Sequence, residues 1–121
     1  MVIDDIDLGP PQAGEVLVKI GAAGLCHSDL SVMDGSRIRP LPMALGHEMA
    51  GIIEECGAGV SHLVPGMRVS VNPSSPCNEC ESCLQGAHNQ CLNMQFMGSA
   101  MRLPHAQGGF RQSITVSSAQ A

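Results

Sequence analysis

Apolar and polar residues alternate along several short stretches of the chain. Val16, Val18 and Ile20 fall on one face of an extended backbone, which predicts a half-buried strand over 15–20. Short apolar runs predict further strands over 49–53, 67–71 and 110–116. A chain with several short strands and little helix favours a small β-barrel.

Glycine and proline clusters separate these runs. Gly21–Gly24 predicts a tight turn directly after the first strand, and Gly57–Gly59 predicts another turn. Between them, Ser28 or Asp29 can cap a short helix that runs to about Met33. We therefore expect a mainly β domain with few short helices over residues 1–121.

Composition limits the function classes. Only two residues are Phe, Tyr or Trp, so the core must rest on aliphatic side chains and on some of the eight methionines. The net charge of −5, without a basic cluster, argues against a nucleic-acid or anionic membrane partner. No run has the length of a transmembrane helix, and the acidic start does not resemble a signal peptide. With cysteines in metal-type spacing, these features indicate a reducing cytoplasm.

A dense cysteine run carries the strongest chemical signal. Its spacing is C-x2-C-x2-C-x7-C, formed by Cys77, Cys80, Cys83 and Cys91. Four thiolates at such spacing predict a structural zinc site, because they fill a tetrahedral shell and leave no position for water. A two-disulfide knot and an iron–sulfur cluster are the alternatives, although the last interval is long for a ferredoxin run and no proline follows it. The lobe would span about 73–95.

Cys26 and His47 are candidates for a second metal site. A catalytic zinc takes about three protein ligands and keeps one position open. Taken alone, each residue has a simpler explanation, Cys26 as a buried thiol and His47 as a hydrogen-bonded loop histidine. The residues around them shift the balance toward metal ligands.

Two motifs surround this pair, Gly24-Leu25-Cys26-His27-Ser28-Asp29 and Gly46-His47-Glu48-x-x-Gly51-x5-Gly57-x2-Val60. Together with the cysteine run, they resemble the zinc-dependent medium-chain alcohol and polyol dehydrogenases. The resemblance implies a GroES-like β-barrel catalytic domain with a zinc-binding lobe. In that family a separate Rossmann domain binds the nicotinamide cofactor, and the G-x-G-x-x-G fingerprint of such a domain is absent from these 121 residues.

The resemblance also implies roles around a catalytic zinc. Cys26 and His47 would bind the metal, and Glu48 would sit behind it as a transient or full ligand. Asp29 would accept a hydrogen bond from the His47 ring and orient it. The third ligand of many family members would come from outside these residues.

Further roles concern the proton and the cofactor. Ser28 would take the alcohol proton, and His27 would lie near the cofactor phosphates. Ser31 stands where many family members carry a relay histidine, so the relay is shortened or differs.

The sequence motifs in the two halves of the chain resemble two different subfamilies. The segments after residue 70 resemble L-idonate and sorbitol-type polyol dehydrogenases, namely Val71-Asn72-Pro73-Ser74, Phe96-Met97-Gly98-Ser99-Ala100-Met101 and Pro104-His105-x-x-Gly108-Gly109-Phe110. The motif Cys26-His27-Ser28-Asp29 is more like the corresponding motif of simple alcohol dehydrogenases. The resemblance therefore implies a small-molecule alcohol or polyol as the substrate, and the two cues leave the choice open.

The resemblance predicts a domain of a zinc-dependent NAD(P) dehydrogenase. Two other functions remain open from the sequence: a structural zinc module that packs against a partner, and a zinc hydrolase. We expect the chain to need a Rossmann domain or partner subunit, to self-associate through apolar surface, and to show no alcohol-dependent NAD(P)H formation by itself.

Overall fold

The computed structural model describes residues 1–99 and 102–121. The last two residues of the motif that begins at Phe96, Ala100 and Met101, lie outside the described residues. The elements follow in the order β1 (Glu15–Gly24), α1 (His27–Met33), β2 (Glu48–Cys56), β3 (Arg68–Val71), β4 (Ser74–Ser75), α2 (Glu81–Leu84), the 3-10 helix η1 (His88–Gln90), β5 (Gln95–Phe96) and β6 (Ser113–Ser117). Strands dominate, which confirms the predicted mainly β fold.

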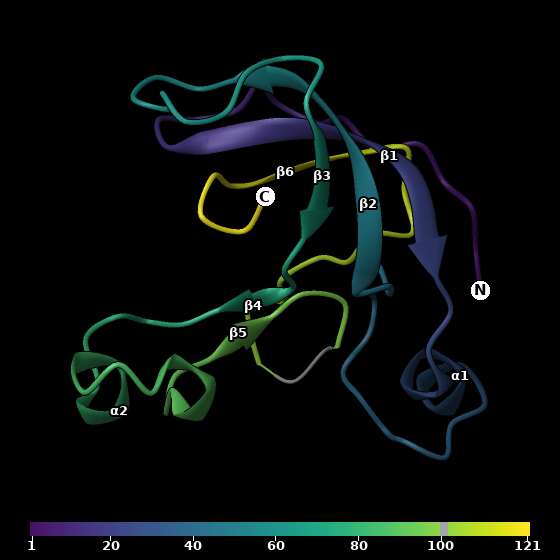
Figure 1. Ribbon diagram of the computed structural model, residues 1–121. Coiled ribbons are helices and arrows are strands. Elements are labelled where there is room, and N and C mark those ends of the chain that lie inside the picture. Colours follow the sequence, from purple (N-terminus) through teal and green to yellow (C-terminus); the bar gives the residue numbers. More distant parts are fainter. Residues whose placement is uncertain (100–101) are drawn as a thin grey trace.

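Four strands form one antiparallel sheet in the order β3-β2-β1-β6. The long strands β1 and β2 curve together across the molecule, and β6 lies on the other side of β1 (Figure 1). The short strands β4 and β5 pair separately and lead into a lobe that carries α2 and projects away from the large sheet (Figure 1). Helix α1 lies near the end of β1, on the opposite side from this lobe.

The first strand is longer than its pattern predicted. The expectation of a tight turn over Gly21–Gly24 was wrong, because this segment stays extended and continues to pair with β2. Gly24 pairs with Glu48, and the pairing register shifts between Ile20 and Ala22. The small residues form no turn here because the local irregularity bends the strand while its backbone remains hydrogen-bonded.

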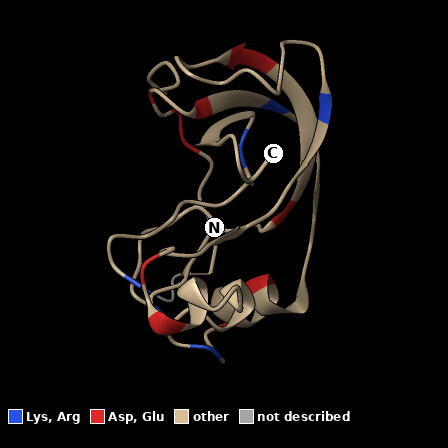
Figure 2. Cartoon of the chain, turned by 60° about the vertical axis from the view of Figure 1, so that its left-hand side comes forward, with Lys and Arg blue, Asp and Glu red and all other residues tan. Residues whose placement is uncertain are grey.

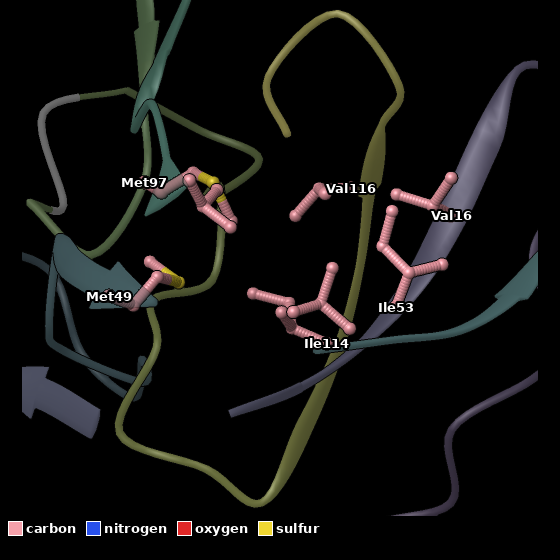
Figure 3. Close-up of a cluster of buried hydrophobic side chains, with 8 residues drawn as sticks. Val16, Met49, Ile53, Met97, Ile114 and Val116 are labelled. Atoms are coloured by element: carbon pink, nitrogen blue, oxygen red, sulfur yellow. The ribbon is translucent and has the colours of Figure 1, made fainter. Parts of the chain in front are cut away.

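The core lies under the large sheet and continues toward the lobe. Its buried side chains are Val16, Val18, Met49, Ile53, Val71, Met97, Ile114 and Val116. Aliphatic residues from β1, β2 and β6 gather in one part of the cluster, and the two methionines lie together in another part (Figure 3). Flexible methionine side chains therefore fill the space where the sheet meets the lobe.

The few charged residues are dispersed over the fold. Acidic positions occur on the strands and the helices, and the lysine and arginine positions lie apart from one another (Figure 2). In the described part of the chain, no helix is both long enough and apolar enough to span a membrane.

Candidate functional site

The four lobe cysteines converge from consecutive turns of the chain. Cys77 precedes α2, Cys80 caps its start, Cys83 lies within it, and Cys91 directly follows η1. Their sulfur atoms all lie within 4.8 Å of one another. Asn78 adopts φ 58°, a left-handed conformation that asparagine tolerates better than most residues.

The spacing of the sulfur atoms fits a single metal ion. Cys91 Sγ lies 3.5 Å from Cys77 Sγ and 4.0 Å from Cys80 Sγ. Four sulfurs at the usual Zn–S bond length in a tetrahedron are separated by about 3.8 Å. All six cysteines are free, so the structure does not contain the disulfide knot. An iron–sulfur cluster places several metal and sulfide ions between its thiolates and needs a wider space than these atoms leave.

The surrounding protein gives the lobe thiols different pKa values. Backbone N–H groups of Cys83 and Leu92 lower the pKa of the Cys80 thiol to about 6, because they donate hydrogen bonds to its sulfur. Burial raises the pKa of the Cys83 thiol to about 12. Binding a divalent cation would have to deprotonate Cys83 and would couple its uptake to proton release.

A second group of donors forms where β1 ends and β2 begins. Cys26 follows β1 by two residues, and His47 directly precedes β2, whose first residue is Glu48. One donor atom from each of these three side chains lies within 4.8 Å of the other two. The antiparallel pairing of Gly24 with Glu48 brings them together, since it places the two segments side by side.

Asp29 connects the two segments of this second group. Its carboxylate accepts the Cys26 N–H at 3.1 Å and the Gly46 N–H at 3.2 Å, and the residue is only 2% exposed. The expected cap at Ser28 or Asp29 was wrong by two or three residues, because α1 begins at His27 and Cys26 takes the cap position. Asp29 instead occupies the third helical position, where an acidic side chain can bond back to the cap backbone.

The His47 ring sits between Asp29 and Ser28. Asp29 Oδ1 lies 3.6 Å from His47 Nδ1, which is buried and has no hydrogen-bond partner among the described residues. On the other side of the ring, Ser28 Oγ lies 3.5 Å from Nε2. A carboxylate facing Nδ1 favours a proton on that nitrogen and leaves the Nε2 lone pair for another partner.

His27 lies outside this cluster. It is exposed at the start of α1, and its Nδ1 lies 3.3 Å from the hydroxyl of Ser31, one helical turn further on. The position is open to a ligand that approaches α1 from solvent.

Two contacts that the motifs did not predict hold His47 in place. The Phe96 ring from β5 packs against the His47 ring with centroids 5.7 Å apart, and this links the lobe to the second donor group. Gly108 crosses the backbone just before His47 so closely that a Cβ at that position would lie 2.4 Å from the Gly46 carbonyl oxygen. Contacts between such distant segments leave no local pattern in the sequence.

The two donor groups suit different tasks. Four thiolates complete a tetrahedral shell by themselves, which is the pattern of a structural site. Thiolate, imidazole and carboxylate donors together are ligands that zinc accepts, and three of them leave one position of a tetrahedron open. The Asp29 carboxylate, 3.6 Å from His47 Nδ1, lies on the side of the ring where a metal-bound imidazole usually has its supporting acceptor.

Fold and site thus define a mainly β domain with one four-cysteine centre and one mixed-donor centre. Residues 12–121 match the family described as the alcohol dehydrogenase GroES-like domain. The chain belongs to this family, as its motifs predicted.

Similar proteins include both kinds of dehydrogenase that the motifs suggested. The chain is 40% identical to alcohol dehydrogenase class-3 of Drosophila melanogaster over 105 residues, 86% of the chain and 28% of that protein. It is also 40% identical to L-idonate 5-dehydrogenase (NAD(P)(+)) of Escherichia coli K12 over 108 residues, 86% of the chain and 31% of that protein.

Solved structures show the same domain. The structure of galactitol-1-phosphate dehydrogenase from Escherichia coli superposes with a TM-score of 0.87 at 36% identity, and the match covers 99% of this chain and 33% of that one. The chain therefore spans about a third of the length of the proteins that it matches.

Proposed function

We propose that this chain is the catalytic domain of a zinc-dependent NAD(P) dehydrogenase that oxidises an alcohol or a polyol. The observation that supports this most directly is the convergence of Cys26, His47 and Glu48 within 4.8 Å. In the proposal residues 1–121 form one domain, and residues about 73–95 form a lobe whose four cysteines hold a structural zinc. The relatives named above include an alcohol dehydrogenase and a polyol dehydrogenase, so both substrate classes stay within the proposal.

Cys26 Sγ, His47 Nε2 and a Glu48 carboxylate oxygen would hold the catalytic zinc. When bound there, zinc lowers the pKa of a coordinated hydroxyl group, so that its proton leaves near neutral pH. Asp29 keeps the His47 Nδ1 proton in place and thereby fixes the orientation of the ring. Ser28 Oγ, which lies 3.5 Å from His47 Nε2, would accept the proton of the alcohol hydroxyl and release its own hydroxyl proton to solvent, so that it relays one proton and stays neutral.

The hydride acceptor would be a nicotinamide cofactor held by a Rossmann domain or partner subunit. Exposed His27 would then lie near the cofactor phosphates. Apolar side chains next to the site support a packing partner at this position, since Leu25 is 83% exposed, Leu30 52% and Met33 49%.

Metal content tests the proposal. Purified protein that is loaded with zinc and freed from excess metal should contain two zinc ions per chain by mass spectrometry. Cys26→Ala should retain one ion and Cys80→Ser should lose the lobe ion, because each removes a ligand from a different centre. Cys56→Ala is a matched control, because Cys56 lies in neither donor group and its thiol contacts the Leu63 carbonyl oxygen.

The possible outcomes separate the centres. One ion in the wild-type chain, with no change in Cys26→Ala, would contradict the catalytic centre and leave only a structural module. Two ions in Cys80→Ser would contradict the four-thiolate assignment.

A further inference from the structure

The backbone conformation of Gly24, the residue opposite Glu48, does not require a glycine. Gly24 ends β1 in an extended conformation, and its φ lies outside the left-handed region that favours glycine. Any L-residue could adopt this backbone. The reason for a glycine here must therefore lie in what surrounds its α-carbon.

The space beside the Gly24 α-carbon is taken by the Glu48 side chain. A Cβ at position 24 would lie 2.4 Å from Glu48 Oε2, 3.1 Å from its Cβ and 3.4 Å from its Cδ. The three nearest atoms thus all belong to this one side chain. An alanine cannot share that space with the carboxylate, so the carboxylate would have to move.

The Glu48 carboxylate can lie in this position because residue 24 has no side chain. Glu48 is an exposed residue, and within residues 1–99 and 102–121 its carboxylate makes no hydrogen bond or ion pair. It nevertheless lies within 4.8 Å of the Cys26 and His47 donor atoms. Removing the space would turn the side chain toward solvent at little cost to the fold, because only the flexible end of one residue has to shift.

We propose that Gly24 is a positioning residue for the metal centre: it leaves the space in which the Glu48 carboxylate lies beside Cys26 and His47. This inference rests on the proposed function, because it gives the three donors a common ligand. It assigns the carboxylate to the metal shell in the resting protein, and it makes the glycine responsible for the third protein donor.

Gly24→Ala tests the inference, with Gly21→Ala as its matched control. Gly21 lies on the same strand, and a Cβ there would meet its nearest atoms at 3.8 and 4.0 Å, which is ordinary contact. Each protein receives one zinc equivalent for the tighter lobe site and is then titrated with Co²⁺. Absorption by the thiolate–cobalt bond reports the second centre, and a competing chelator gives its affinity.

We expect Gly24→Ala to weaken cobalt binding at the second centre by about 10–100-fold, the range found when groups that orient metal ligands are removed. Its cobalt spectrum should change in the same way as that of Glu48→Ala, whereas Gly21→Ala should match the wild type. In a Glu48→Ala background the glycine substitution should have no further effect, because the side chain that it displaces is gone.

Three results would overturn the inference. An unchanged affinity and spectrum in Gly24→Ala, with two metals bound to the wild type, would refute it alone. An equal further loss in the Glu48→Ala background would show that position 24 acts through the backbone and not through the carboxylate. Uptake of only one metal by the wild type would refute the proposed function, and this inference with it.

Discussion

Replacing Asp29 with alanine should destabilise the domain far more than a typical substitution of an acidic residue. The Asp29 carboxylate is buried and accepts the N–H groups of Cys26 and Gly46 at 3.1 and 3.2 Å. In Asp29→Ala both donors lose their acceptor inside the protein. The variant therefore releases the link between the start of α1 and the segment before β2, the two parts of the chain that carry the metal donors.

The magnitude follows from the two hydrogen bonds. A hydrogen bond to a charged group contributes about 1.5–3 kcal/mol, so the loss of two gives about 3–6 kcal/mol. Water that enters the space left by the carboxylate restores part of this, which places the expected loss near 3 kcal/mol. Because a domain of this kind has about 5–15 kcal/mol of stability in total, the change is large. Asp29→Asn should lose about half as much, since one oxygen still accepts one N–H.

Urea unfolding followed by far-ultraviolet circular dichroism measures the effect, because the chain has no Trp or Tyr for fluorescence. Asp34→Ala is the control, since the exposed Asp34 carboxylate accepts the Ser36 N–H at 2.8 Å and water can take its place. The measurement is repeated at two free zinc concentrations. A loss caused by weaker zinc binding grows with zinc, whereas a loss of hydrogen bonds does not. Equal losses for Asp29→Ala and Asp34→Ala would refute the argument.

One further substitution tests the packing around His47, and one labelling experiment tests the thiols of the lobe. Gly108→Ala should lower the free energy of unfolding by about 1–3 kcal/mol in the same assay, because its Cβ would lie 2.4 Å from the Gly46 carbonyl oxygen. Gly9→Ala is the control, because a Cβ there meets no atom within 4 Å. Equal losses of stability in the two variants would contradict the reasoning. In metal-free protein at neutral pH, iodoacetamide mapped by mass spectrometry should label Cys80 first and Cys83 last, since their pKa values are about 6 and about 12. The lowered pKa of Cys80 stabilises the folded lobe fully above the ordinary thiol value of 9.0 and is lost as the pH falls through about 6, so Cys80 labelling should slow below that pH. Labelling of both thiols at one rate would count against this difference.

The lobe could be predicted from the sequence because its contacts are local. Cys77 and Cys91 are the most distant ligands, and only the short helices α2 and η1 with their connecting turns separate them. The spacing itself limits where the sulfurs can go, so the motif and the geometry carry nearly the same information. The alternation at Val16 and Val18 was informative for a similar reason, since period two alone decides which side chains of a strand are buried.

The second centre could be predicted only in part. Its residues were identified by motifs, and their approach depends on how β1 pairs with β2. The packing of Phe96 on His47 was not predicted, because it joins segments that are distant along the chain and no spacing rule connects them. The space above Gly24 was missed for the same reason: a glycine in a Gly/Ala run suggests a turn, and only the partner strand shows that it makes room for a carboxylate.

The register shift in β1 lies in the same Gly21–Gly24 segment that was wrongly expected to form a turn, and it also affects the metal site. Ile20 pairs with Gly51, and a regular ladder from that pair would place Ala23 opposite Glu48. The register shift after Ile20 adds one residue to β1, so that Gly24 takes the position opposite Glu48. A regular strand would place the methyl group of Ala23 opposite the first residue of β2, whereas the structure has Gly24 there, and the Glu48 side chain occupies the space beside its α-carbon. The small-residue run that resembled a turn is therefore the part of the fold that sets the alignment of the metal donors.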